Sequence, residues 1–411
     1  MFTKPEVLMT RARTRARQLL VSLSHTLSAS PAEGTVGNAA AAARSARTRP
    51  AAGRLVAAAA ALMVPAFLLA VAGPAAAVSL SGTTGLPVIA VEGPGNSLDY
   101  YYQSPPGTWH EQQVAAPGWT FSAPSLAQAG TTTVIAAEGP ANSLMFYIQH
   151  VPGGAWTPKR VAGPGTTFSA PSVAVVNSGS SWSIAAEGLN NSLMFYYQYF
   201  TLWASQQVAG SGTTFSAPSL AEIYLGLGIA AEGSGNSLDF YAQGTSGAWT
   251  AQQAAADGTT FSAPSLAMLN TGTGIAADGP SSSLMLYTHT NPAGTWQSQQ
   301  VAPAGSAYSA PSLTQLAELQ SIGTFYYTMI AVGGHLGLLD VYTKGPALIS
   351  PWQDSVPGSL NSTLSAPSLA PVGGGAGVAT MGANHSLNYY NQLAPYATWT
   401  HQQVPGTGAY G

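Results

Sequence analysis

Residues 122–149 read SAPSLAQAGTTTVIAAEGPANSLMFYIQ, and variants of this stretch recur along most of the chain. The opening phrase, Ser-Ala-Pro-Ser, returns with its prolines 47, 47, 46, 47 and 56 residues apart. These prolines are Pro124, Pro171, Pro218, Pro264, Pro311 and Pro367. A nearly fixed period of this length indicates that one supersecondary unit is repeated many times.

Within the same stretch, the phrase Ile-Ala-Ala-Glu-Gly or a variant of it marks seven copies of the unit. The copies start at Ile89, Ile135, Ile184, Ile229, Ile275, Ile330 and Val378. In every copy a glycine follows the start by four residues, a leucine by nine and a tyrosine by twelve, and a tryptophan stands further on. We expect the glycine to supply a positive φ in a turn. We expect the aromatic residues to pack between units, because they bury large areas.

Each unit has the pattern of four short strands. In the unit that opens with Pro124 these are APSLA, VIAAE, SLMFYIQ and a last strand led by Trp156. Clusters of Gly, Pro, Asn and Ser mark the turns, and the aromatic and β-branched residues favour strand over helix. The small residues of the first strand suit an innermost position. Four strands at this period predict an all-β fold, a seven-bladed β-propeller with four antiparallel strands per blade.

The seven units fill residues 78–411, at about 48 residues each, and leave no room for a second domain. Val78 stands eleven residues before Ile89, the offset that also separates Pro124 from Ile135. We therefore expect blade 1 to be formed wholly by residues 78–114 and blade 7 wholly by the C-terminal end. Ring closure would then depend on face packing of blades 7 and 1, without a shared strand.

Residues 1–77 are predicted to be a basic leader and a signal peptide. Nine of the twelve Lys and Arg lie at or before Arg54, an almost wholly apolar segment follows, and small residues lead up to Ala77. This order is typical of secretory signals, so we expect cleavage near Ala77 and a secreted, extracellular protein. The alternative is an uncleaved membrane anchor, which Pro65 and Gly73 disfavour. After cleavage no membrane association is expected.

Composition and charge exclude several classes of function. The chain has no cysteine, which excludes a disulfide scaffold, a zinc ribbon and a cysteine nucleophile. From Val78 onward thirteen Asp and Glu stand against three Lys and Arg, a net charge of about −10. A domain with so few bases cannot neutralise a run of phosphates, so nucleic acid is excluded as a partner.

Polar residues recur on two kinds of loop that a propeller brings to one face. The BC turn, between the second and third strands, reads Glu-Gly-Pro-x-Asn-Ser, and the DA loop, from the fourth strand to the next blade, reads Ala-Gly-x-Gly-Thr-Thr-Phe. Loops on a rigid scaffold often carry binding residues. The acids are Glu92, Glu138, Glu187, Glu232 and Asp278, and the amides four residues later are Asn96, Asn142, Asn191 and Asn236. Units 6 and 7 lack the acid.

Two interpretations of these acid–amide pairs remain open. In the first, carboxylate and amide bind the hydroxyls of a small polar ligand such as a sugar, and a nearby Trp or Tyr stacks on its apolar face. In the second, the carboxylate accepts hydrogen bonds from backbone amides of the turn and closes the blade. Trp119 and Trp182 are additional to the repeat. We expect both on loops, as an exposed stacking platform for a ligand.

No catalytic motif stands out. The sequence contains no His-Glu-x-x-His, no Gly-x-Ser-x-Gly and no phosphate-binding loop. Glycoside hydrolysis needs two carboxylates in different environments, whereas the carboxylates here are equivalent copies one blade apart. We therefore expect a non-catalytic protein with no metal site and no cofactor.

The order of motifs resembles that of bacterial seven-bladed propeller lectins of the PLL type and, more distantly, tectonin-type propellers. The resemblance covers residues 78–411 and rests on Ser122-Ala123-Pro124, on the turn from Gly139 to Leu144 and on the last strand from Trp156 to Gly163. It implies binding of fucose or related sugars in pockets between adjacent blades. The Arg and Trp-His pairs of that family are replaced here by Glu and Asn of the BC turn.

These observations favour a secreted, non-catalytic, lectin-like protein with repeated sites on one rim or between blades. Its expected partners are glycans or a cell-surface polysaccharide, because weak sites repeated on a rigid ring raise avidity. The alternative is a protein–protein interaction or cell-envelope assembly propeller, which would dock a secreted protein partner on its flat face.

Overall fold

The computed structural model describes residues 78–81, 85–176, 181–224, 226–290, 294–347 and 350–406. Contacts divide the chain into residues 1–69 and 70–411, and every described residue belongs to the second unit. The predicted leader and its cleavage near Ala77 lie outside the described residues. No helix in the described part of the chain is long and apolar enough to cross a bilayer.

Within these ranges, twenty-eight strands form seven four-stranded antiparallel sheets, one per blade, as the repeat predicted. In blades 1 to 3 the strands are β1 (Val78–Ser81), β2 (Val88–Glu92), β3 (Leu98–Gln103), β4 (Trp109–Ala115), β5 (Ser125–Ala129), β6 (Thr132–Gly139), β7 (Ser143–Gln149), β8 (Thr157–Ala162), β9 (Ser172–Val176), β10 (Ser181–Gly188), β11 (Ser192–Tyr199) and β12 (Leu202–Ala209). In blades 4 and 5 they are β13 (Ser219–Ile223), β14 (Gly226–Glu232), β15 (Leu238–Gln243), β16 (Trp249–Ala255), β17 (Ser265–Leu269), β18 (Gly272–Gly279), β19 (Ser283–His289) and β20 (Gln297–Ala302).

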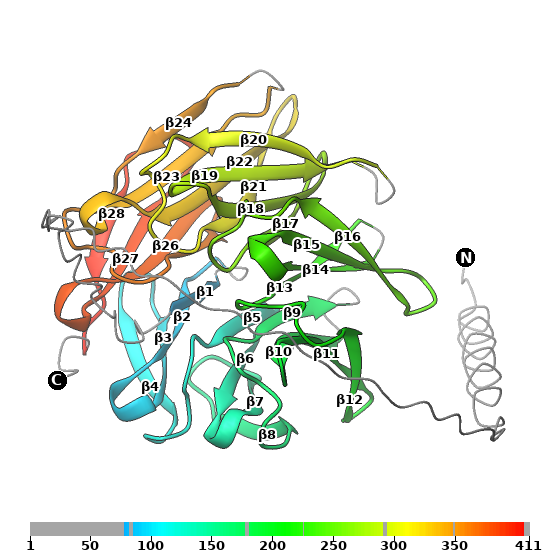
Figure 1. Ribbon diagram of the computed structural model, residues 1–411. Coiled ribbons are helices and arrows are strands. Elements are labelled where there is room, and N and C mark those ends of the chain that lie inside the picture. The colour runs from blue at the N-terminus through cyan, green and yellow to red at the C-terminus, as the bar shows by residue number, and fades with distance from the viewer. Residues whose placement is uncertain are drawn as a thin grey trace, which may run out of the picture. The chain divides into compact units, whose positions relative to one another are not determined.

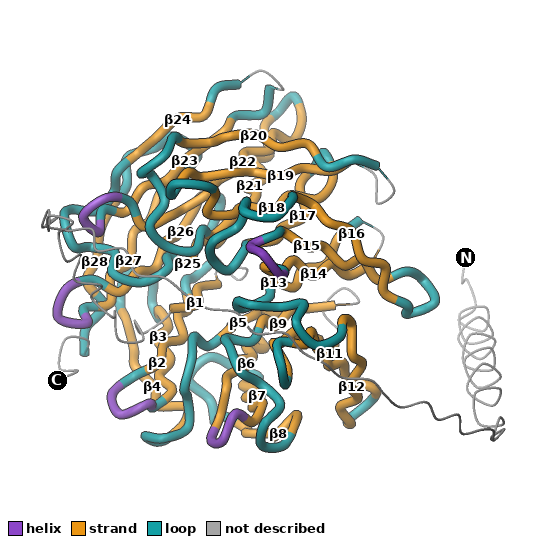
Figure 2. The backbone as a smooth tube through the Cα atoms, viewed as in Figure 1, coloured by secondary structure: helices purple, strands orange, loops and turns teal. Residues whose placement is uncertain are grey.

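Blades 6 and 7 complete the ring. Their strands are β21 (Ser312–Gln320), β22 (Gly323–Gly333), β23 (Leu339–Lys344), β24 (Trp352–Ser355), β25 (Ser368–Val372), β26 (Gly375–Met381), β27 (Leu387–Gln392) and β28 (Thr400–Gln403). Five BC turns contain a single 3-10 turn, which Figure 2 shows in purple. These are η1 (Pro94–Asn96), η2 (Pro140–Asn142), η3 (Ser234–Asn236), η4 (His335–Gly337) and η5 (Ala383–His385).

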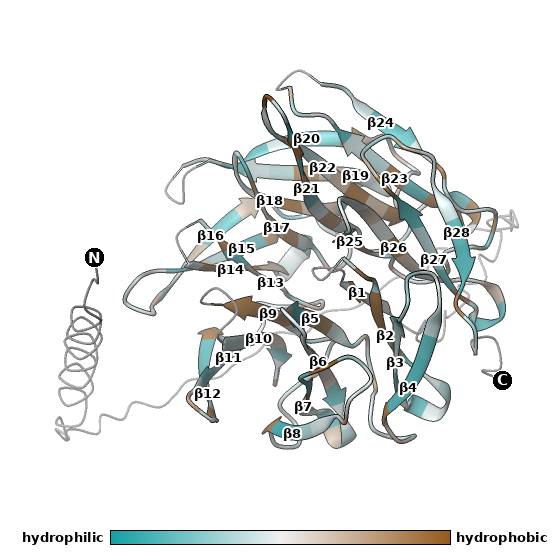
Figure 3. Ribbon diagram, turned by 180° about the vertical axis from the view of Figure 1, so that it is seen from behind, coloured by the Kyte–Doolittle hydropathy of each residue, from teal (hydrophilic) through white to brown (hydrophobic). Residues whose placement is uncertain are grey.

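The first strand of each blade is innermost, as the small residues of that strand predicted (Figure 1). Each inner strand contacts the inner strands of the two neighbouring blades, and the ring closes where β1 meets β25 and β5. Apolar residues concentrate on the inner and middle strands, while outer strands such as β4, β24 and β28 are hydrophilic (Figure 3). The ring is therefore a set of wedges that bury their faces against one another.

Each hydrophobic cluster combines residues of two consecutive blades, which confirms that the aromatic residues pack between units. The tryptophan of one blade packs edge-on against an aromatic residue in the third strand of the blade before it, at ring-centroid distances of 5.0–5.3 Å. The pairs are Trp156–Tyr100, Trp203–Phe146, Trp249–Phe195, Trp296–Phe240 and Trp109–Tyr389. Edge-to-face contacts of this kind add to the area that the rings bury.

A repeated serine joins the inner strands in a ring of hydrogen bonds. The last serine of Ser-Ala-Pro-Ser accepts from a backbone amide of the next blade, at 2.9–3.0 Å. The donor–acceptor pairs are Val173–Ser125, Leu220–Ser172, Leu266–Ser219, Leu313–Ser265, Leu369–Ser312 and Leu80–Ser368. The repeat of this serine is thus explained by blade-to-blade attachment.

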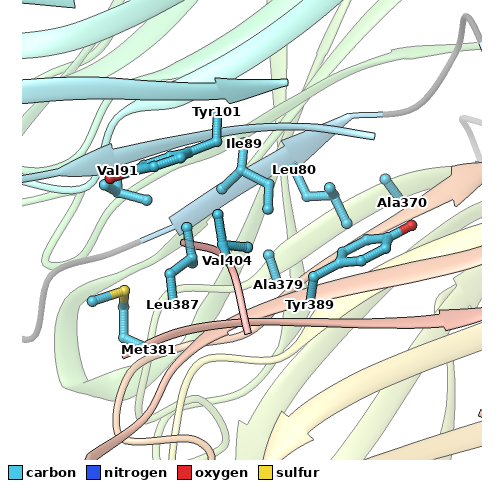
Figure 4. Packing of buried hydrophobic residues seen from close by; sticks show 10 residues of the cluster. All are labelled: Leu80, Ile89, Val91, Tyr101, Ala370, Ala379, Met381, Leu387, Tyr389 and Val404. Carbon is cyan, nitrogen blue, oxygen red and sulfur yellow. The ribbon is translucent and has the colours of Figure 1, made fainter. Parts of the chain in front are cut away.

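Blades 1 and 7 meet at a seam without a shared strand, as expected. β1 pairs with β2 in the first sheet, and the sheet of blade 7 consists of β25 to β28 alone. Leu80, Ile89 and Tyr101 of blade 1 pack against Leu387 and Tyr389 of blade 7 (Figure 4). Apolar packing and the Ser368 hydrogen bond therefore hold the seam closed.

The reason predicted for the seven-fold glycine of the BC turn is wrong. Gly93 has a φ of −100° and Gly139 a φ of −103°, so neither needs the left-handed region. A Cβ on Gly139 would instead lie 2.5 Å from Cγ of Met145 in the third strand. The glycine is required because side chains of that strand fold back against the turn and leave no room for a methyl group. The positive φ belongs to the partner position, for example 58° at Asn142.

Candidate functional site

The BC turns and DA loops are hydrogen-bonded to each other on one face, as the topology predicted. In blade 2 the backbone amides of Thr166 and Thr167 donate to the carbonyl of Asn142, at 2.9 and 3.0 Å. The next amide, of Phe168, donates to the carbonyl of Glu187 in blade 3, at 3.0 Å. Each DA loop of blades 1 to 6 therefore spans from the turn of its own blade to the acid position of the next blade. We call this face, built from the BC turns and DA loops, the rim.

Four acids of the rim are paired with the amides that the sequence singled out. The Asn Nδ2 group donates to Oε1 of the Glu at 2.6–2.8 Å, and the four glutamates are only 7–8% exposed. The pairs are Glu92–Asn96, Glu138–Asn142, Glu187–Asn191 and Glu232–Asn236. The left-handed backbone of each asparagine points its side chain back to the acid, since Asn tolerates that conformation better than most residues.

Burial changes the acidity of three of these glutamates and of Asp278. It raises the pKa of Glu92, Glu138 and Glu187, and the hydrogen bond from the asparagine partly offsets the rise. Asp278 has Ser282 in place of asparagine, and burial followed by the charge of Glu232 raises its pKa to about 6. These four carboxylates, of Glu92, Glu138, Glu187 and Asp278, are therefore poorly solvated when ionised, which favours any hydroxyl that donates to them.

An exposed aromatic residue follows the Thr-Thr pair of the DA loop, and the sequence analysis did not single it out. Phe121, Phe168, Phe215 and Phe261 are 39–48% exposed. Tyr308 and Leu364 take the equivalent positions in the next two loops and are also exposed. The recurring phrase Thr-Thr-Phe marks this position in the sequence. The exposure of the Phe side chain, however, depends on how the loop is attached to the next blade.

Trp119 and Trp182 differ in their exposure to solvent. Trp119 lies on the DA loop of blade 1 and is 37% exposed, and its backbone occupies the place that Thr166 has in blade 2. Trp182 was expected on an exposed loop, and this is wrong. It lies in β10, pairs with Val175 of β9 and is 6% exposed within the core of blades 2 and 3. The strand begins earlier than expected, and its alternation turns Trp182 inward.

The rim combines these features at four blade boundaries. Each boundary brings together the exposed Phe of one blade and the acid of the next, because the Phe amide is bonded to the carbonyl of that acid at 2.9–3.1 Å. The pairs are Phe121–Glu138, Phe168–Glu187, Phe215–Glu232 and Phe261–Asp278. At the two following boundaries the acid is replaced by Gly333 and Met381. The aromatic–acid boundaries therefore form an arc over blades 1 to 5.

Among the described residues, no three His, Asp or Glu side chains are grouped so that they could hold a metal ion.

The sequence matches no protein-family model and no curated protein. The structure is similar to that of BP39L lectin from Burkholderia pseudomallei, with a TM-score of 0.69 and 14% identity over 80% of this chain and 99% of that chain. It is also similar to SapL1 lectin in complex with alpha methyl fucoside, with a TM-score of 0.50 and 10% identity over 82% of this chain and 98% of that chain. AofleA from Arthrobotrys oligospora gives a TM-score of 0.50 and 14% identity over 68% of this chain and 86% of that chain. The chain therefore shares the propeller fold of known lectins.

Proposed function

We propose that this protein is a secreted, non-catalytic, carbohydrate-binding propeller whose sites repeat along the rim. The observation that carries the proposal is that, at four blade boundaries, the backbone amide of an exposed Phe is hydrogen-bonded to the backbone carbonyl of a residue whose side chain is a largely buried carboxylate. An aromatic face accommodates the apolar C–H face of a sugar, and a few placed polar groups fix its hydroxyls. The resemblance to propeller lectins in motif order and in fold supports the same class of ligand.

Blades 6 and 7 argue that the acid does more than close its turn. Their BC turns form without it, because Gly334 donates to Leu338 at 2.8 Å and Gly382 to Ser386 at 2.8 Å in the same way as Gly93 to Ser97. The DA loops of these boundaries also dock, since Tyr308 and Leu364 donate to the carbonyls of Gly333 and Met381. A largely buried carboxylate that the turn does not require is better explained by a ligand than by the architecture.

Glycan binding by the purified protein tests the proposal. We expect a glycan array to show a narrow set of sugars, with avidity lowered at least about tenfold when Phe168→Ala and Phe215→Ala are combined. Tyr224→Ala is the matched control, because Tyr224 is 84% exposed on the hairpin between β13 and β14, away from the rim. A blank array for the folded protein, or equal loss in the control, would remove the rim assignment.

The other elements of the proposal have their own tests. Secretion is tested by the N-terminus of the protein recovered from culture supernatant, which we expect near Val78. Absence of catalysis is tested with chromogenic glycosides, and turnover that survives purification of the protein would refute it.

A second function, docking of a secreted protein partner, is favoured by one observation. At the two boundaries that lack the acid, the exposed positions of the DA loops are occupied by Tyr308 and Leu364. The exposed apolar surface therefore extends beyond the four boundaries that carry a carboxylate. A stoichiometric partner that is captured from supernatant by the wild-type protein, and lost with Leu364→Ser, would establish this function in place of the first.

A further inference from the structure

The end of the propeller opposite the rim carries its most exposed apolar side chains. We call this end the base; it is formed by the AB hairpins, between the first and second strands, and by the CD turns, between the third and fourth strands. The most exposed large apolar residue of the rim is Leu336, at 62%. Seven large apolar residues among those the structure describes are more exposed, at 64–85%, and all lie in or beside AB hairpins and CD turns: Tyr199, Phe200, Leu202, Tyr224, Leu319, Ile322 and Leu393.

The CD turn of blade 3 holds a phenylalanine in a backbone conformation that favours glycine. Phe200 has a φ of 55° and is 85% exposed, and its ring packs edge-on against that of Tyr199, which is itself exposed. In blade 2 the equivalent position, three residues before the tryptophan of the last strand, is Gly153 with a φ of 74°. A left-handed backbone is unfavourable for a bulky side chain. Glycine would therefore serve the turn at least as well, and the architecture does not explain the ring of Phe200.

The AB hairpin of blade 6 is longer than those of the other blades. β21 and β22 pair over nine residues, whereas the first two strands of the other blades pair over four or five. Four additional pairs lengthen the hairpin by about 13 Å, at about 3.3 Å per residue. Tyr327 braces the hairpin by an edge-on contact with Tyr396 of blade 7. The end of the hairpin exposes Leu319 and Ile322, at 83% and 82%.

The acids of the propeller are concentrated at the rim. Nine of the thirteen Asp and Glu that follow Val78 lie at the BC turns, in the DA loops or at the start of the third strand, and no Lys or Arg lies there. The nine are Glu92, Asp99, Glu138, Glu187, Glu232, Asp239, Asp257, Asp278 and Asp340. In the rest of the propeller four acids stand with all three Lys and Arg, so their charges nearly cancel. The molecule thus has a strongly anionic rim and, at the opposite end, an apolar base without an excess of acids.

One of the three cations lies beside the exposed CD turn of blade 3. Lys159 of β8 donates a hydrogen bond to the carbonyl of Thr201 in that turn. In blade 1 the equivalent residue is Gln112, whose Oε1 accepts from Nε1 of Trp156 in the next blade at 3.1 Å. A lysine cannot accept, and Nε1 of Trp203 is buried without a partner among the described residues. Attachment of the blades therefore does not explain the lysine, which adds a positive charge at the base.

These features favour a lipid surface over a protein partner. The exposed residues stand at the ends of separate hairpins in blades 3, 4, 6 and 7, whereas a protein interface needs one closely packed, complementary patch. Aromatic and aliphatic side chains beside a lysine are typical of segments that enter the headgroup region of a bilayer, where the ammonium group reaches a phosphate. We propose that the base binds the surface of a phospholipid bilayer, with the tips of the blade 3 CD turn and the blade 6 AB hairpin inserted among the headgroups. The anionic rim then faces water.

This inference departs from the sequence-based expectation of no membrane association after removal of the leader. The apolar tips are one to three residues long, too short to stand out in the sequence, and only their exposure in the folded chain shows them. The inference does not depend on the proposed glycan sites, because these lie on the rim, at the other end of the blades.

The first test is flotation of the purified protein with phosphatidylcholine vesicles that contain no glycolipid. We expect the wild-type protein to float with the vesicles, and Phe200→Gly and Ile322→Ser each to weaken the partition at least about tenfold. Phe200→Gly copies Gly153 and should fold at least as stably as the wild type, so its loss of binding cannot come from unfolding. Leu336→Gly is the matched control and should bind unchanged. Leu336 is also an exposed apolar residue with a left-handed backbone, at a φ of 57°, but it lies on the rim.

The second test reads insertion locally, so that a retained leader cannot imitate it. Because the chain has no cysteine, Phe200→Cys and Leu336→Cys each give a single site for a polarity-sensitive fluorophore. Vesicles should shift the emission to the blue at position 200 and leave it unchanged at position 336.

Several results would overturn the proposal. These are no shift at position 200, an equal loss of flotation in Leu336→Gly, or binding that requires phosphatidylglycerol and disappears at high salt, which would indicate attraction by the lysine alone. Self-association without vesicles that is lost in Phe200→Gly would assign the base to a second copy of the chain. Phe200→Gly should leave glycan-array binding unchanged, so failure of this proposal and failure of the proposed function are distinguishable.

Discussion

Asp99 provides a sharp test of how burial acts on this fold. The side chain lies at the start of β3, is 3% exposed, and accepts a hydrogen bond from the Ser97 hydroxyl at 3.0 Å. Burial raises its pKa from 3.8 to about 6; the Ser97 hydroxyl opposes the rise and the charge of Glu111 adds to it. The folded state therefore holds this proton more tightly than the unfolded chain.

The sign and size of the effect follow from linkage. Because the folded pKa lies above the unfolded value, the contribution of Asp99 to stability is fully present below about pH 4 and is lost as the pH rises through about 6. Two pKa units correspond to about 3 kcal/mol, which is an upper value for one group. Removing the charge should restore that free energy at neutral pH. Blade 7 shows that the amide fits, since Asn388 takes the same place there.

We therefore expect Asp99→Asn to raise the free energy of unfolding at pH 7.5 by about 1–3 kcal/mol and to leave it nearly unchanged at pH 4. The assay is denaturant unfolding at pH 4, 5.5 and 7.5, followed by circular dichroism. Glu222→Gln, at an exposed carboxylate of β13, is the control and should change stability little at either pH. An equal gain at pH 4 and 7.5 would show that ionisation is not the cause. A loss at pH 7.5 would refute the argument outright.

Three further substitutions test the packing of the blades by the same unfolding assay. Ser368→Ala removes the serine hydrogen bond across the seam and should cost about 1 kcal/mol, and an unchanged midpoint would mean that face packing alone closes the ring. Gly139→Ala places a methyl group against Met145 and should cost about 1–3 kcal/mol, whereas a neutral result would show that the Met145 side chain moves aside and that the steric explanation is wrong. In blade 3 the Tyr196 hydroxyl has Thr166 of the preceding loop as its hydrogen-bond partner, whereas the equivalent Tyr147 hydroxyl is buried without a partner because Trp119 stands in place of the threonine. Trp119→Thr should supply that partner and raise the free energy of unfolding by about 0.5–1.5 kcal/mol. A lower free energy of unfolding would indicate that the indole itself stabilises the loop.

The fold could be predicted from the sequence because every contact that defines it is repeated. The period, the tryptophan of each unit and the offset of Val78 from Ile89 are one-dimensional signals, and they predicted the number of blades, the strand order and the seam. The reason for Gly139 could not be predicted, since the obstacle is Met145 on the paired strand. The inward position of Trp182 depends on where β10 begins, and a turn-rich sequence around residue 180 hides that boundary.

The residues of the candidate site also differ in whether the sequence alone could predict their contacts. The acid and the amide of each pair lie four residues apart within one turn, so the sequence alone predicted that they would be neighbours. The aromatic partner, Phe168, belongs to the loop of the preceding blade, and its place beside Glu187 depends on a backbone hydrogen bond that no local pattern encodes.

The repeat also distinguishes residues that recur in every blade from residues that some blades lack. The serine, glycine, tyrosine and tryptophan of each unit recur because each holds one blade to itself or to the next. The acid of the rim is absent from two blades whose turns are intact. Features that the architecture tolerates losing are not explained by stability. On the function proposed above, we therefore expect ligand binding, rather than folding, to account for the arc of acids.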